Sequence, residues 1–173
     1  AGPIGGRPGL ISQEDMANIL EVADKNTSGH SAKASVVPQW FDLPHQINAT
    51  LPAIINDDTS YILARAVQFL LPGEPQVYYV GLLNGPDDKE LFEKTGNGRE
   101  VNRHHYSAQE IEKALRSDVT LAILGLARLR RHEVFSGTFD WQKLTSSSMR
   151  LSWTSQSAEL SLQFEFAGGR SSF

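Results

Sequence analysis

The spacing of apolar residues along the chain changes near Phe135. Upstream, as in residues 118–131 (DVTLAILGLARLRR), apolar residues recur at every helical turn. Downstream, as in residues 159–166 (ELSLQFEF), they alternate one by one with polar residues. A helix and a strand need these two different periods, so we expect a largely helical region followed by an antiparallel sheet with one face in water.

Three helices are marked by signals at their N-terminal ends. Ser12 is a candidate N-cap for a helix at residues 13–24. Residues 57–59 (DDT) offer an N-terminus for a mostly apolar helix at residues 60–71, which ends at a Pro-Gly pair. Ser107 and Glu110 have the spacing of a capping box, in which each residue satisfies a backbone N–H group of the other. Residues 25–40 are rich in small residues without periodicity and are predicted to be a loop.

Between these helices, residues 76–80 (QVYYV) predict a buried strand of a parallel sheet, because they are uniformly apolar and aromatic. The predicted fold class is therefore α/β followed by β. After this strand, residues 82–106 form a long polar connection. A loop of this length in a compact domain is usually functional or disordered, and we interpret it as the rim of a binding site.

Composition excludes several classes of protein. The chain contains no cysteine, so it has neither a disulfide framework nor a thiolate metal site. Its net charge of -4 gives no reason to expect nucleic acid or an anionic membrane as a partner. The histidines lack zinc-site spacing, and we predict no metal and no cofactor. No apolar run approaches the ~18 residues of a membrane span, and because nothing points to an oxidising compartment, a cytoplasmic location is the default expectation.

The long connection gathers side chains with many hydrogen-bond donors. Such side chains suit a hydroxyl-rich or anionic ligand. An ordered surface loop whose polar groups satisfy one another is the alternative, and the residues alone leave both interpretations open. The side chains concerned are Asn97, Arg99, Asn102, Arg103, His104 and Tyr106.

Residues 64–107 resemble sucrose phosphorylases and their relatives in glycoside hydrolase family 13. The specific matches are the segments PGEPQVYYVG and GREVNRHHYS. Residues 9–32 are similar to the small inserted domain of that family, residues 42–48 (DLPHQIN) to its mobile loop, and residues 137–166 to the first strands of its C-terminal domain.

This resemblance implies the late part of a (β/α)8 barrel with an inserted small domain, followed by part of an antiparallel C-terminal β-domain. The implied boundaries are an insertion domain at 1–57, the last βα units of the barrel at 58–133 and the partial β-domain at 134–173. The nucleophile, the acid/base and a third, stabilising carboxylate are expected upstream of Ala1, so the chain alone is expected to be inactive.

The resemblance also implies retaining transfer of a glucosyl group from an α-glucoside, sucrose or sucrose 6-phosphate, to inorganic phosphate, giving glucose 1-phosphate. Action on glucosylglycerol or glucosylglycerate stays open, as does a non-catalytic carbohydrate-binding module. A homodimer of the intact enzyme also stays open.

Four substrate-binding residues are implied by the same resemblance. Arg99 matches an arginine that binds a distal hydroxyl of the glucosyl ring, and Gln46 matches a glutamine that contacts the acceptor. His45 stands where sucrose phosphorylases usually have tyrosine, and it resembles relatives that act on sucrose 6-phosphate, because an imidazole can donate to the phosphate. An additional proline leaves open whether Asp42 or its neighbour occupies the acidic position of this loop.

Overall fold

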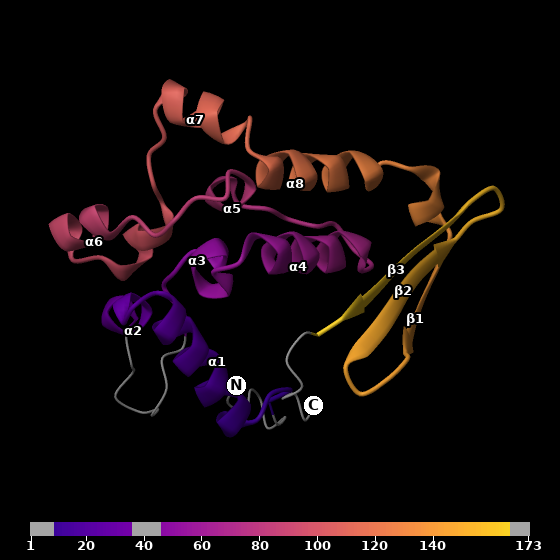
Figure 1. The fold of residues 1–173 in the computed structure, drawn as a ribbon, viewed down its shortest axis with the longest axis horizontal. Helices are drawn as coiled ribbons and strands as arrows, with labels where there is room; N and C mark the ends of the chain where they lie inside the picture. The colour runs from indigo at the N-terminus through magenta and orange to yellow at the C-terminus, as the bar shows by residue number, and fades with distance from the viewer. Residues whose placement is uncertain (1–8, 36–45, 167–173) are drawn as a thin grey trace. The chain divides into compact units, whose positions relative to one another are not determined.

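The computed structural model describes residues 9–35 and 46–166. In these ranges a helical region precedes a three-stranded antiparallel sheet (Figure 1), which confirms the change of structure predicted near Phe135. The chain divides into two compact units, one of Ala1–Tyr61 with Tyr78–Arg116 and the other of Ile62–Val77 with Ser117–Phe173. Each unit has its own packing and is described separately.

The helices are α1 (Gln13–Asn26), α2 (His30–Ala34), α3 (Leu51–Ile55), α4 (Asp58–Leu70), α5 (Tyr79–Leu82), α6 (Lys89–Thr95), α7 (Ala108–Ala114) and α8 (Asp118–Leu129), with 3-10 helices η1 (Gly98–Asn102) and η2 (Glu133–Ser136). The strands are β1 (Thr138–Lys143), β2 (Ser148–Thr154) and β3 (Glu159–Glu165). None of the helices within the described ranges is long and apolar enough to cross a membrane.

The first unit begins with α1, whose predicted N-cap is confirmed, because Ser12 Oγ accepts a hydrogen bond from the N–H of Asp15 at 3.0 Å. The loop predicted for residues 25–40 is wrong at α2. Two side chains from the end of α1 start this helix: Thr27 Oγ1 accepts from the N–H of Ser31, and Asp24 Oδ1 from the N–H of Ala32, both at 3.0 Å. A helix of one turn is too short to show an apolar period.

The long connection also contains more regular structure than predicted. Asp88 Oδ1 accepts from the N–H of Leu91 at 2.9 Å and begins α6, and Asn97 Oδ1 accepts from the N–H of Arg99 at 3.1 Å and begins η1. The capping box predicted at the start of α7 is confirmed. Short polar caps therefore organise this segment without any apolar pattern.

The buried parallel strand predicted at residues 76–80 is wrong for the described chain. Tyr78 is extended, with φ -68° and ψ 146°, but the next residue already begins α5. The sheet in the described ranges consists of β1, β2 and β3 alone, so no strand lies beside this segment to accept its hydrogen bonds. Instead, the side chains of Tyr78 and Tyr79 remain 53% and 40% exposed.

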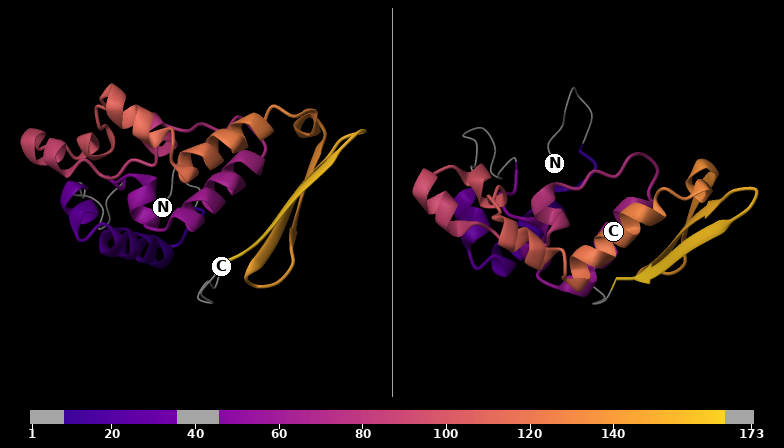
Figure 2. Two further views of the ribbon diagram at one scale, coloured as in Figure 1. Left: turned by 45° about the horizontal axis from the view of Figure 1, so that its top comes forward. Right: turned by 90° about the horizontal axis from the view of Figure 1, so that it is seen from above.

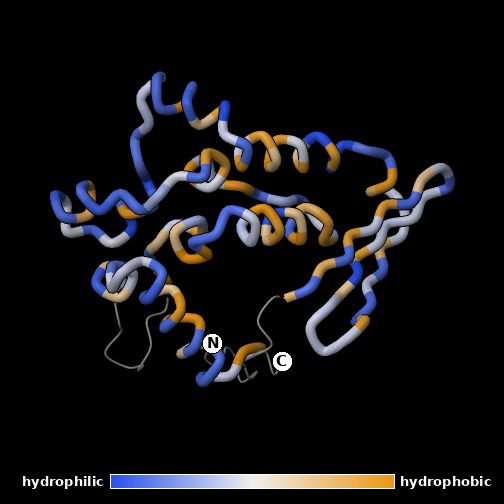
Figure 3. Tube along the Cα trace, in the orientation of Figure 1, coloured by the Kyte–Doolittle hydropathy of each residue, from blue (hydrophilic) through white to orange (hydrophobic). Residues whose placement is uncertain are grey.

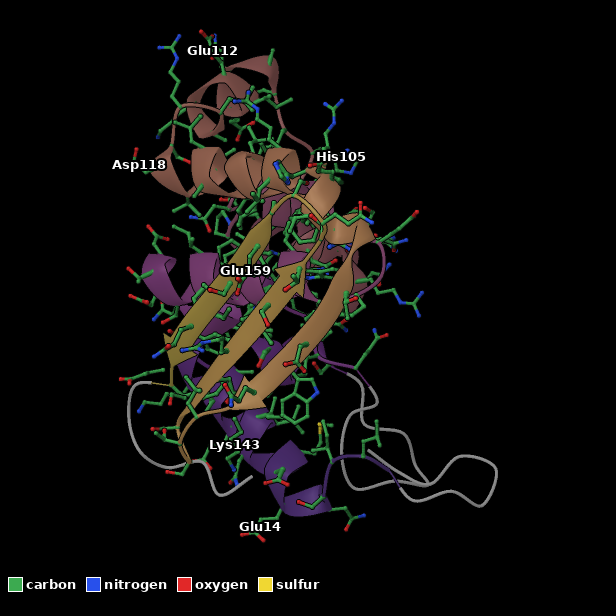
Figure 4. All side chains as sticks on the ribbon, turned by 90° about the vertical axis from the view of Figure 1, so that its right-hand side faces the viewer. Glu14, His105, Glu112, Asp118, Lys143 and Glu159 are labelled. Atoms are coloured by element: carbon green, nitrogen blue, oxygen red, sulfur yellow. The ribbon has the colours of Figure 1, made fainter. Side chains whose placement is uncertain are left out.

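The second unit contains the sheet, in the order β1-β2-β3 with antiparallel neighbours, as the alternating sequence predicts. In the register Trp141 lies opposite Leu151, which lies opposite Leu162, so one face is apolar across all three strands. Figure 2 shows the strands from two further directions, and Figure 4 places Lys143 at the end of β1 and Glu159 at the start of β3.

The apolar core of the second unit forms where one face of the sheet meets the end of α4. Leu70, Leu151 and Phe164 are buried there. The indole Nε1 of Trp153 donates to the backbone carbonyl of Leu70 at 2.6 Å, which satisfies one of the carbonyls left free at the C-terminus of the helix. The colouring by hydropathy in Figure 3 shows the apolar turns of α4 and α8. Around the core pack Leu63, Val67, Phe135, Phe139, Met149 and Leu162.

We expect Leu151→Ala to lower the free energy of unfolding by about 2–5 kcal/mol, because it leaves a cavity in this core. Urea denaturation followed by circular dichroism measures the change. Leu121→Ala is the matched control, since this leucine of α8 is 52% exposed. Equal losses for the two variants would contradict the assignment of the core.

Candidate functional site

Arg99 lies in η1 and its side chain is exposed. The acidic neighbour in the turn, Glu100, is engaged by two other residues: its Oε1 lies 3.3 Å from Arg103 Nη1 and 3.4 Å from Asn97 Nδ2. Among the described residues, no hydrogen bond or ion pair involves the guanidinium of Arg99. No described side chain thus uses the several donors of this planar group, and the role of Arg99 in binding stays a prediction.

Gln46 is held by a buried asparagine. Its Nε2 donates to Asn48 Oδ1 at 2.9 Å. Asn48 is fixed in turn by two bonds to the α2 region, since its N–H donates to Ser35 Oγ at 3.1 Å and its Nδ2 donates to the carbonyl of Ala34 at 2.9 Å. The side-chain amide of Gln46 is thus positioned by Asn48, which is itself held by hydrogen bonds to the α2 region.

Gly98 joins these two segments. A Cβ atom at Gly98 would lie 2.0 Å from the carbonyl oxygen of Ala34 and 2.6 Å from Asn48 Nδ2, so the backbone of the Arg99 turn packs directly on the segment that carries Gln46. The structure therefore brings two of the four predicted binding residues onto adjoining segments.

The other two predicted binding residues, Asp42 and His45, lie outside the described residues. Their roles stay predictions that rest on the sequence.

His104 links the two ends of the segment between Asp88 and α7, because its ring contacts Asp88 at one end and Glu110 at the other. Nδ1 of His104 lies 2.6 Å from Asp88 Oδ2, and Nε2 lies 3.2 Å from Glu110 Oε1. The hydrogen bond to Asp88 raises the pKa of His104 against the opposing effect of burial. Hydrogen bonds from the backbone and hydroxyl of Ser107, and then from His104, lower the pKa of Glu110 to about 2. Three titratable groups therefore favour their charged forms together.

Asp87 is directed to the opposite side of the chain from its neighbour Asp88. Its Oδ1 accepts from the N–H of Thr50 at 2.6 Å, and its Oδ2 lies 3.9 Å from Nδ1 of the buried His30. The sequence did not lead us to predict that the two carboxylates of Asp87 and Asp88 bind different segments. The sequence signal for this arrangement is the pair of carboxylates directly before α6. One of them is enough to cap the helix, so the other is free to bind elsewhere.

A separate hollow of ≈ 650 Å³ lies in the first unit and is lined mostly by polar side chains. Neither Arg99 nor Gln46 lines it, and two of its amide side chains are used within the protein: Asn26 Nδ2 donates to the carbonyl of Ile54 at 2.7 Å, and Asn84 Nδ2 to Asp58 Oδ1 at 3.2 Å. No group of three or more His, Cys, Asp or Glu side chains suited to a metal ion occurs in the described part of the chain.

Comparison with known proteins identifies the relatives of this chain, although no model of a protein family matches it. Sucrose phosphorylase from Bifidobacterium adolescentis is 41% identical over 160 residues, which are 91% of this chain and 32% of that protein. Sucrose 6(F)-phosphate phosphorylase from Thermoanaerobacterium thermosaccharolyticum is 45% identical over 124 residues, which are 70% of this chain and 25% of that protein. Glucosylglycerol and glucosylglycerate phosphorylases are also among the relatives.

A solved structure matches as well. The crystal structure of sucrose 6F-phosphate phosphorylase from Thermoanaerobacter thermosaccharolyticum matches with a TM-score of 0.83 and 34% sequence identity, covering 94% of this chain and 34% of that chain. The chain is thus related to a class of phosphorylases. Within that class it is a homologue of the sucrose phosphorylase family, and it spans about a third of the length of the curated relatives it matches.

We expect Gly98→Ala to lower the free energy of unfolding by about 1–3 kcal/mol, because its Cβ would meet a backbone carbonyl that cannot rotate away. Gly125→Ala on α8 is the control: no atom lies within 4 Å of its new Cβ, and alanine favours a helix by about 1 kcal/mol over glycine. Thermal unfolding of both variants measures the difference. A loss for Gly125→Ala as large as that for Gly98→Ala would contradict the close contact.

Proposed function

We propose that this chain supplies part of the substrate pocket of a phosphorylase that transfers the glucosyl group of sucrose or sucrose 6-phosphate to inorganic phosphate. The observation that carries the proposal is a similarity to such enzymes in sequence and in structure through nearly the whole chain. The products are glucose 1-phosphate and the released acceptor.

In this proposal the chemistry is retaining. A carboxylate nucleophile forms a glucosyl ester while a second carboxyl group protonates the leaving oxygen, and phosphate then takes the glucosyl group. These carboxylates come from a part of the enzyme other than this chain, whose residues bind and orient. Arg99 donates to a distal hydroxyl of the glucosyl ring, and Gln46 contacts the acceptor.

We assign residues 58–133 to the last βα units of a (β/α)8 barrel, residues 1–57 to an inserted domain and residues 134–173 to a C-terminal β-domain. This assignment would explain why the extended segment before α5 has no neighbouring strand in the described part of the chain. Residues 76–78 would become a barrel strand once strands from the rest of the enzyme lie on both sides, because closure requires all eight.

The acceptor is chosen in this proposal by the residues around Gln46. His45 favours sucrose 6-phosphate, because an imidazole can donate a hydrogen bond to the additional phosphate. The relatives that act, by name, on glucosylglycerol and glucosylglycerate support a second candidate, a phosphorylase with one of these acceptors.

In the complete enzyme, Arg99→Ala should lower kcat/KM for the glucosyl donor at least about tenfold, since loss of a charge-assisted hydrogen bond costs ~1.5–3 kcal/mol. Release of glucose 1-phosphate measures the rate. Arg116→Ala is the control, because this exposed arginine pairs with Glu112 on the surface of α7. An unchanged kcat/KM in Arg99→Ala would remove Arg99 from the site.

His45→Tyr should shift the preference of the enzyme toward unphosphorylated sucrose, because it removes the imidazole that can donate to the phosphate and restores the tyrosine usual in sucrose phosphorylases. The ratio of kcat/KM values for sucrose and sucrose 6-phosphate measures the shift. If neither substrate reacts but glucosylglycerol or glucosylglycerate does, the second candidate replaces the first. A ratio that stays at the wild-type value would show that His45 does not determine which acceptor the enzyme prefers.

A further inference from the structure

Both ring nitrogens of His104 face carboxylate oxygens, those of Asp88 at 2.6 Å and of Glu110 at 3.2 Å. An ionised carboxylate only accepts hydrogen bonds, so each nitrogen must carry a proton to bond in this arrangement. A neutral imidazole has one N–H group and would turn the lone pair of its other nitrogen toward a carboxylate. The arrangement is therefore complete in the imidazolium form only.

The bond to Asp88 closes a loop that contains Arg99. A second closure lies beside it, because the N–H of Asp88 donates to the carbonyl of Val101 at 2.8 Å. The backbone of His104 is fixed as well, since the hydroxyl of Tyr79 donates to its carbonyl at 2.9 Å. With both ends joined, residues 88–104 have fewer conformations available, and η1 is held within a closed segment.

The surroundings of His104 are predominantly negative. Asp88 faces it from the start of α6 and Glu110 from α7, and the ring of Tyr106 packs against it edge-on at 4.6 Å. The nearest cation in sequence, Arg103, is paired with Glu100. The pKa of His104 is raised by its bonds to the two carboxylates, which agrees with the geometry.

We propose that His104 is a positioning residue for Arg99: its imidazolium joins Asp88 to Glu110 and holds loop 88–104 in the form that binds the glucosyl group. The closure itself follows from the contacts of these three side chains. The role of Arg99 as the group that is positioned rests on the proposed function.

The sign of the pH dependence follows from the direction of each shift. The folded-state pKa of His104 is raised above the ordinary value of ~6.5, so its contribution is complete below that pH and is lost as pH rises through the raised value. The pKa values of Asp88 and Glu110 are lowered, so their contributions are complete above the ordinary pKa values of these carboxyl groups and are lost as pH falls through the lowered ones. The loop should be held best in weakly acidic solution and released on the alkaline side.

The closure is tested by NMR titration of the histidine rings in the complete enzyme, with His104→Gln to assign the signal. We expect His104 to titrate above ~6.5 and Glu110→Gln to lower its midpoint, although glutamine can still serve in the capping box. Glu112→Gln is the matched control on the same helix (Figure 4), because Glu112 pairs with Arg116 and should leave the midpoint unchanged. A midpoint at or below ~6.5, or equal effects of the two variants, would overturn the closure.

The positioning role is tested by the kinetics of the same enzyme. His104→Gln should raise KM for the glucosyl donor about two- to fivefold with little change in kcat, and should abolish the alkaline rise of KM seen in the wild type. His104→Arg, which stays charged and can donate to both carboxylates, should restore KM across the pH range. His105→Gln, at the exposed neighbouring position, should behave as the wild type.

Two failures can be told apart. If Arg99→Ala lowers kcat/KM but His104→Gln keeps the wild-type KM and pH profile, the positioning role is wrong while the proposed function stands. If Arg99→Ala has no effect, the proposed function fails and the positioning role falls with it, whatever the titration of His104 shows.

Discussion

The first unit depends on two consecutive carboxylates that point in opposite directions. Asp87 reaches back to the N–H of Thr50 at the start of α3 and to the buried His30 of α2, and Asp88 reaches forward to α6 and His104. Asp88 accepts two hydrogen bonds, from the N–H of Leu91 and from His104, whereas Asp87 accepts one, from the N–H of Thr50. These bonds offset part of the cost of removing the two carboxylates from water. One dipeptide therefore ties the early helices to the segment that carries Arg99.

The two units are stabilised in different ways. In the second, a ladder of apolar side chains across three strands buries Leu151 and Phe164 against the end of α4, and the main polar contact of this core is the indole of Trp153 on a helix carbonyl. In the first, apart from the 14-residue α1, the helices are short, and several of them begin at Asp, Asn or Thr caps. Hydrogen bonds are directional, so the side-chain bonds of the first unit fix the distances between its short segments.

How much of the structure could be predicted from sequence depended on whether the signal was local. Ser12, the Ser107 capping box and the alternation in residues 159–166 are contained in a few neighbouring residues, and each prediction was confirmed. A strand at residues 76–80 would need neighbouring strands, which the described part of the chain does not supply, and α2 depended on caps from the preceding helix. The contact of Gly98 with Asn48 joins residues far apart in sequence, so no pattern of neighbouring residues predicts it. Arg99 and Gln46 were named through the family resemblance, whereas their placement on adjoining segments required the fold.

The close approach at Gly98 has a consequence for how this segment can evolve. The nearest atom to a new Cβ there is the backbone carbonyl oxygen of Ala34. Every amino acid has this backbone group, so no substitution at position 34 removes it. A compensating substitution on the facing helix therefore cannot make room, and relief would require the helix itself to shift. A substitution at a position of this turn whose side chain faces solvent leaves the backbone contact unchanged, but a change at Gly98 would require a rebuilt backbone.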